Sequence, residues 1–176
     1  MTHSNTTALR LALLSLSALI FACGEGVPGA EEGESFAISS GTYAVSNATI
    51  ASGTDACGLF GAYADPDKRI GIQVAGSEVT FNLSNSATAP AQSLDRAQLT
   101  GNAIDQYTAT SYTVAFDDTC VVRVHRTVTG TVTGPDTAAL TLDFSVSTEA
   151  GQCSGDNTAF DTVPCSATYQ FTATRR

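Results

Sequence analysis

The chain has 176 residues and a net charge of −9 at pH 7, from 8 Lys and Arg against 17 Asp and Glu. Nucleic-acid binding relies on Lys and Arg to neutralise phosphates, and the sequence has no basic stripe, so nucleic acid is excluded as a partner. The acidic charge also argues against attachment to anionic lipid by charge. The length suits one folded domain of ordinary size.

Residues 1–22 are predicted to be an export signal. Residues 11–22 carry no charge, Arg10 precedes them, and the small Ala22 comes directly before Cys23. This is the layout of a secretory signal peptide. Twelve residues make a helix of about 18 Å, whereas the bilayer core is about 30 Å thick, so a permanent membrane span is not expected.

The end of this segment, Ile20-Phe21-Ala22-Cys23, resembles the lipobox of bacterial lipoproteins. In that family the peptide is cut before the cysteine, which is acylated and becomes the first residue. Phe21 departs from the small residue usual at its position. The resemblance implies lipidation of Cys23 and an envelope location. The outer membrane is expected because Gly24, and not Asp, follows the cysteine. A plain secreted protein is the alternative.

Residues 23–34, CGEGVPGAEEGE, are rich in Gly and Glu and show no apolar repeat. Such a composition is typical of a flexible, self-repelling tether. We therefore expect lipid on the first residue of this tether to hold the following domain close to a membrane. One acyl chain anchors only marginally, and more than one makes the attachment stable.

Five cysteines are present, and a lipid on the first leaves four for two disulfides in an oxidising compartment. Four cysteines allow three pairings. Cys153 and Cys165 flank a polar loop and are expected to pair with each other, which leaves Cys57 with Cys120. A zinc site is not expected, because C-x-x-C spacing is missing and one His remains after cleavage.

Apolar residues alternate with polar ones in many segments after residue 40, which predicts β-strands. The abundance of Thr and Val favours the same structure. Residues 56–64 are the candidate for a short helical turn, and residues 84–93 are predicted to be a loop. We expect about eight strands, drawn from the segments 43–46, 70–74, 79–83, 97–100, 104–108, 112–116, 120–132, 140–146 and 165–173.

Residues 35–176 are therefore predicted to form an all-β domain, an antiparallel up-and-down meander. Its edges must be hidden by closure into a barrel or by packing of two sheets, and we favour the barrel. Gly41-Thr42-Tyr43 resembles the Gly-x-Trp that begins the first lipocalin strand, with Tyr in place of Trp. The resemblance implies a calycin-like barrel with a cup for a small apolar ligand.

Few residues in the sequence are candidates for catalysis or ligand binding. His125 alternates with apolar neighbours and is expected on the outer surface, and Lys68 is expected in a solvated turn. Arg126 interrupts the apolar face of residues 120–132, and we expect a bulge to turn it outward. Alternatively, it projects into a polar cavity, where it could bind a ligand carboxylate through two hydrogen bonds.

The loop between Cys153 and Cys165 contains Asp156, Asn157 and Asp161, whose oxygens could hold Ca²⁺, but their spacing matches no EF-hand. We therefore expect no metal and no cofactor. The chain has one His after the predicted cleavage and no G-x-S-x-G elbow, which argues against an enzyme. Two functions stay open, a lipocalin-like module that binds a small apolar ligand and a structural or protein-interaction lipoprotein without a cavity.

Overall fold

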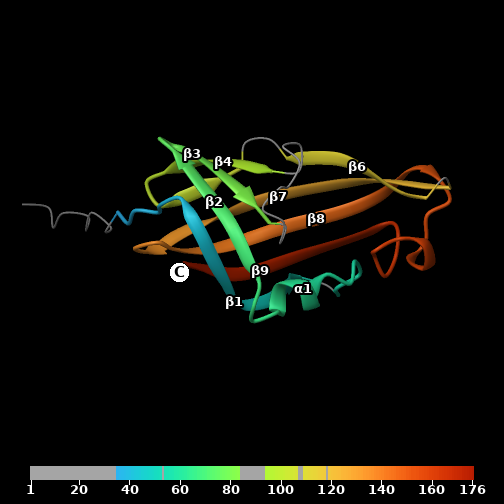
Figure 1. Cartoon of the computed structure of the whole chain (residues 1–176), viewed down its shortest axis with the longest axis horizontal. Helices are drawn as coiled ribbons and strands as arrows, with labels where there is room; N and C mark the ends of the chain where they lie inside the picture. The colour runs from blue at the N-terminus through green and yellow to red at the C-terminus, as the bar shows by residue number, and fades with distance from the viewer. Residues whose placement is uncertain (1–34, 53, 84–93, 107–108, 118) are drawn as a thin grey trace, which may run out of the picture. The chain divides into compact units, whose positions relative to one another are not determined.

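The computed structural model describes residues 35–52, 54–83, 94–106, 109–117 and 119–176. Within these ranges the chain forms nine strands, one short α-helix and one 3-10 helix (Figure 1). The elements, in chain order, are β1 (Gly41–Ser52), α1 (Phe60–Ala64), β2 (Arg69–Ala75), β3 (Glu78–Asn82), β4 (Asp95–Thr100), β5 (Ala103–Asp105), β6 (Thr110–Asp117), β7 (Cys120–Gly134), β8 (Thr137–Gly151), η2 (Gly155–Asn157) and β9 (Cys165–Arg175).

The all-β prediction is confirmed, with nine strands where about eight were expected. All nine belong to one antiparallel sheet with the order β5-β4-β3-β2-β1-β9-β8-β7-β6. Most neighbours in this order are also neighbours in sequence, as in a meander. Short turns join some of them, including residues Gly134–Thr137 between β7 and β8. The predicted helical turn in residues 56–64 is also confirmed, as α1.

Two strands, β5 and β6, pair with the same edge of β7. Residues 120–126 of this edge pair with β6, and residues 129–131 pair with β5. The β5 pairing joins the first strand of the sheet order to β7, so the hydrogen-bonded strands form a ring. The long strands β7, β8 and β9 lie side by side, and β1 and β2 cross them at one end (Figure 1).

The core follows the period-two alternation of the strands. Along β7 and β8 buried positions alternate with more exposed ones over most of the length, because successive side chains point to opposite faces of a strand. The largest side chains that are fully enclosed include Tyr43, Tyr169, Phe81, Ile70 and Ile72. Within the described residues, no helix has the length and apolar character needed to cross a bilayer.

The predicted disulfide pairing is wrong, although all four expected cysteines are bonded. The bonds join Cys57 to Cys165 and Cys120 to Cys153. The strand register explains this outcome. Cys120 lies opposite Gly151 in the β7–β8 pair, two residues before Cys153. Cys165 begins β9, and β9 pairs with the end of β1, which leads directly to Cys57.

The predicted signal segment 1–22, the tether 23–34 and the lipidation residue Cys23 lie outside the described residues, as does the predicted loop 84–93.

Candidate functional sites

Arg126 lies inside the ring of strands and forms an ion pair there. Its side chain leaves β7 on the core face and is 8% exposed. The guanidinium Nε donates to both carboxylate oxygens of Asp95, at 2.9 Å and 2.8 Å, and Asp95 is 0% exposed. The expected bulge is wrong, because the β7–β8 register is regular from Val122 to Val132 and carries Arg126 inward.

Two further side chains lie beside this pair. Arg126 Nη1 lies 3.4 Å from the hydroxyl of Tyr112, and the guanidinium carbon lies 5.5 Å from the centre of the Tyr112 ring. Thr110 hydrogen-bonds to Asp95, and its hydroxyl also lies 3.3 Å from the Leu94 carbonyl oxygen. The described side chains around Arg126 therefore include its carboxylate partner, Asp95, and the ring of Tyr112.

Burial and charge act in opposite directions in this pair. Burial alone lowers the pKa of Arg126, but the adjacent Asp95 carboxylate outweighs it and raises the pKa above its usual value. Burial raises the pKa of Asp95, and Arg126 opposes that rise. The guanidinium therefore stays charged, and the pair is held by its mutual hydrogen bonds.

Lys68 is also buried, which corrects the prediction of a solvated turn. Its side chain runs inward from the residue before β2, and the residue is 6% exposed. The ammonium donates to the carbonyl of Leu83 at 2.8 Å and lies 5.2 Å from the centre of the Tyr63 ring. Burial lowers the pKa of Lys68. This is the only Lys in the sequence, which is the one signal that could have marked it.

Tyr63 reaches the interior from α1. Its ring stacks on Tyr169 and Phe171 of β9, with centroids 5.3 Å and 5.6 Å apart. Burial raises the pKa of Tyr63 to about 12, so its hydroxyl stays neutral at physiological pH. Tyr63 and Lys68 are both buried next to α1.

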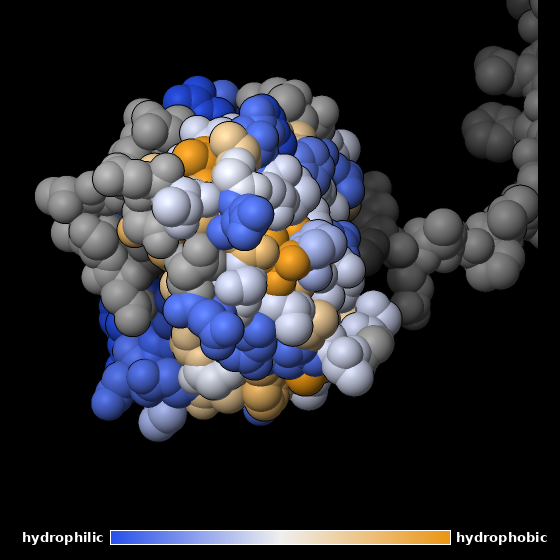
Figure 2. All heavy atoms as spheres, turned by 90° about the vertical axis from the view of Figure 1, so that its right-hand side faces the viewer, coloured by the Kyte–Doolittle hydropathy of each residue, from blue (hydrophilic) through white to orange (hydrophobic). Residues whose placement is uncertain are grey.

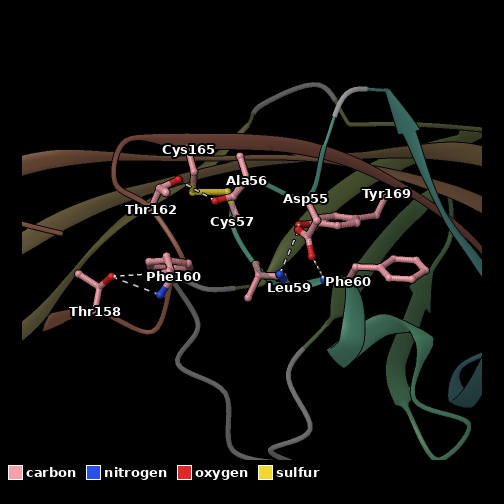
Figure 3. The surroundings of a disulfide bond; sticks show 10 residues. All are labelled: Asp55, Ala56, Cys57, Leu59, Phe60, Thr158, Phe160, Thr162, Cys165 and Tyr169. Atoms are coloured by element: carbon pink, nitrogen blue, oxygen red, sulfur yellow. Dashed lines mark hydrogen bonds between the residues drawn. A yellow bond between two sulfur atoms is a disulfide. The ribbon is translucent and has the colours of Figure 1, made fainter. Parts of the chain in front are cut away.

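The segment that carries α1 is anchored by Asp55 and Cys57 (Figure 3). The Asp55 carboxylate accepts hydrogen bonds from the backbone N–H groups of Leu59 and Phe60, at 3.1 Å and 2.7 Å, and from the hydroxyl of Tyr169. Partial burial would raise the pKa of Asp55, but these hydrogen bonds outweigh it and lower the pKa. One carboxylate thus fixes α1 to β9.

A surface hollow of about 500 Å³ surrounds His125 on the outer face of β7, β8 and β9. His125 is exposed, as predicted, and lies directly opposite Ser145 in the β7–β8 register. Asp143 lines the same hollow, and its carboxylate accepts a hydrogen bond from Thr168 at 2.7 Å. Among the described side chains, the His125 ring has no hydrogen bond to Ser145 or Asp143. The arrangement therefore lacks the relay that activates a nucleophile.

One residue of the candidate calcium loop, Asp161, contacts the segment before α1. Asp161 packs its carboxylate against Gly58 of the segment before α1, and its backbone N–H lies 3.4 Å from the Cys57 carbonyl oxygen. Across the described residues, no group of three or more His, Cys, Asp or Glu side chains is placed to share a metal ion.

No family model, no curated protein and no solved structure matches this chain.

Proposed function

We propose that this chain is an exported bacterial lipoprotein, held at the envelope through lipid on Cys23, most simply at the outer membrane. Its domain is a lipocalin-like β-barrel with a filled interior. It acts as a structural or protein-interaction module and neither carries an apolar ligand inside nor performs catalysis. The β5–β7 pairing, which joins the strands into a ring, supports the barrel.

One observation favours an interaction module over a carrier of an apolar ligand. A ligand carboxylate in the barrel would need the guanidinium of Arg126, and the carboxylate of Asp95 already binds it at 2.8 Å. Among the described residues, every buried side-chain nitrogen and oxygen has a hydrogen-bond partner. A hollow carrier would instead keep polar groups aimed into free space for its ligand.

The disulfides support export and lipidation. Bonds within 57–165 and 120–153 use all four cysteines after Cys23, so an odd cysteine is left at the position where the lipobox resemblance places the lipid. Two disulfides are typical of proteins outside the cytosol.

The test uses fluorescent fatty acids titrated into the wild type, Arg126→Ala and Asp95→Asn. We expect no saturable binding to the wild type. Saturable binding that is lost in Arg126→Ala would overturn the filled barrel in favour of a carrier. Asp95→Asn keeps the shape of the carboxylate and weakens its hold on Arg126, so it shows whether the interior opens once the internal partner is removed.

Anchoring is tested separately by mass spectrometry of the protein purified from membranes. We expect cleavage before Cys23 and acyl groups on that residue, and we expect Cys23→Ser to appear in the soluble fraction. An uncut chain with a free thiol at this position would overturn the lipoprotein assignment.

A further inference from the structure

The strand β6 is an open edge in the described part of the sheet. At the other end of the sheet order, β5 is closed by its pairing with β7. In contrast, β6 pairs only with β7 among the described strands, so one row of its backbone N–H and C=O groups has no strand partner there. Such a row is a template for another strand.

The sequence of β6 has little of the usual protection of an edge before its last residue, Asp117. Native edge strands are blunted by Lys, Pro, short length or bulges. Residues 110–116, TSYTVAF, contain no charge and no Pro, and they are rich in β-branched and aromatic side chains. The one register shift in the β6–β7 pair falls at the end, between Ala115 and Asp117. An uncharged stretch such as residues 110–116 pairs readily with a further strand.

The core-facing side of β6 is incompletely covered. Tyr112, Val114 and Phe116 are partly buried and pack against the core. The ring of Phe116 meets Phe160 edge-on, with centroids 5.9 Å apart. A strand added to the open edge would cover the remaining apolar surface of these three side chains.

The described residues on the face shown in Figure 2 are mostly polar, and the apolar ones form small separate patches. Backbone pairing along β6 does not depend on a broad apolar patch among these residues.

We propose that β6 pairs antiparallel with β6 of a second copy of this chain, with the two Val114 residues facing each other. This register brings Tyr112 opposite Phe116 of the second copy on the inner face, an aromatic pair that stabilises antiparallel strands. On the outer face it brings Thr113 opposite Ala115 of the second copy. The resulting interface is two-fold symmetric and closed.

The charge distribution allows a second copy of the chain to pair with β6, despite the net charge of −9. The acidic residues follow Phe116 in the sequence, with Asp117 as the last residue of β6. Antiparallel pairing places the acidic ends of the two strands at opposite ends of a strand of roughly 24 Å, at about 3.4 Å per residue. That separation exceeds the Debye length of about 8 Å at physiological ionic strength, so their repulsion is screened.

A single strand pair buries less surface than a stable dimer needs, which is about 1,200 Å² or more. The pairing therefore rests on the proposed function, because lipid anchors on one membrane raise the effective concentration of the two copies. We expect pairing that depends on the density of the protein on the membrane.

The test follows hydrogen exchange at the amides of residues 111–116 in the lipidated full-length chain, on phosphatidylcholine vesicles at increasing protein density. Thr113→Lys/Ala115→Lys places like charges opposite each other in the proposed pair, and Thr113→Glu/Ala115→Glu does the same with the other sign. Ala139→Lys/Gln170→Lys is the matched control, because both of its positions are exposed on strands with neighbours on both sides.

We expect protection of these amides to rise with density in the wild type and the control. Protection should be absent in either charged variant alone and return when the Lys and Glu variants are mixed. Protection independent of density would mean that the chain covers its own edge, and exposure at every density would mean that no copy binds there; either result overturns the proposal. Co-flotation of the protein with the vesicles is measured first. If the chain does not float, the proposed lipid anchor is wrong, and hydrogen exchange of the same variants is measured against protein concentration in solution.

Discussion

The side-chain amide of Gln106 replaces a backbone partner for Val128. Its Oε1 accepts a hydrogen bond from the Val128 N–H, and its Nε2 lies 3.5 Å from the carbonyl oxygen of Arg126. The Val128 N–H lies on the edge of β7 between the stretch paired with β6, which ends at Arg126, and the stretch paired with β5. The Gln106 side chain therefore contacts β7 at the gap between β6 and β5.

Loss of this bridge should destabilise the point where the strands close into a ring. We expect Gln106→Ala to lower the free energy of unfolding by about 1–3 kcal/mol, because it leaves buried backbone groups without a partner. Hydrogen exchange should speed up at the Val128 amide, while central amides of β8 change little. Gln98→Ala is the control, since the Gln98 amide contacts Ser77 at the surface. Equal effects of both substitutions on Val128 would contradict the bridge.

Removing one partner of the Arg126–Asp95 pair should destabilise the fold more than replacing both partners with apolar residues. We expect Asp95→Ala or Arg126→Ala to lower the free energy of unfolding by about 3–5 kcal/mol, because each leaves an uncompensated buried charge. The double variant Asp95→Leu/Arg126→Met should recover much of that loss. Urea unfolding with intact disulfides measures all three.

The surface pair Arg123–Glu149 is the control for this series. It has a similar geometry, with 2.7 Å between its charged atoms, but both side chains are well exposed. Its removal should change stability little, because solvent screens exposed ion pairs. A double apolar variant at positions 95 and 126 that is no more stable than the single variants would contradict the buried-charge argument.

The two disulfides should contribute unequally to stability. They join residues 108 and 33 positions apart. In the chain-entropy account the longer closure contributes about 4.7 kcal/mol and the shorter about 3.7 kcal/mol. We therefore expect Cys57→Ala/Cys165→Ala to unfold at a lower denaturant concentration than Cys120→Ala/Cys153→Ala. Peptide mapping of the unreduced wild type checks the pairing, and a 153–165 bridge would overturn it.

Acid should loosen the attachment of α1 through Asp55. The folded state lowers the pKa of this carboxyl, whereas an unfolded Asp titrates near 3.9. The folded state therefore binds fewer protons, so its stabilisation is present above about pH 4 and lost as the pH falls through the lower folded value. Asp55→Asn should show a flatter loss of stability below pH 5. Unfolding curves from pH 7 to pH 3 give the comparison, and parallel profiles would contradict it.

The strands themselves were largely predictable from the sequence. In β8 the residues Leu140, Leu142, Phe144 and Val146 alternate with polar neighbours, and all four are buried. Arg126 has the same parity as the buried residues of β7, so the pattern placed it inward, whereas its charge suggested the opposite. The carboxylate that resolves this conflict is 31 residues away in the sequence, at a position with no local signal.

Lys68 and Tyr63 show the same limit. A Lys after Asp65-Pro66-Asp67 has the composition of a solvated turn, and a Tyr in a five-residue helix has no clear buried face. Their burial follows from where Asp55 and the Cys57–Cys165 bond hold α1 against β9.

By itself, the sequence determined the all-β class, the approximate strand positions and the face of most strand side chains, because alternation with a period of two is a local property. Only the tertiary structure decided which cysteines meet, which carboxylate binds Arg126 and which edge stays open. Those outcomes depend on the register between strands far apart in the chain, and a shift of one residue would send each of these side chains to the other face.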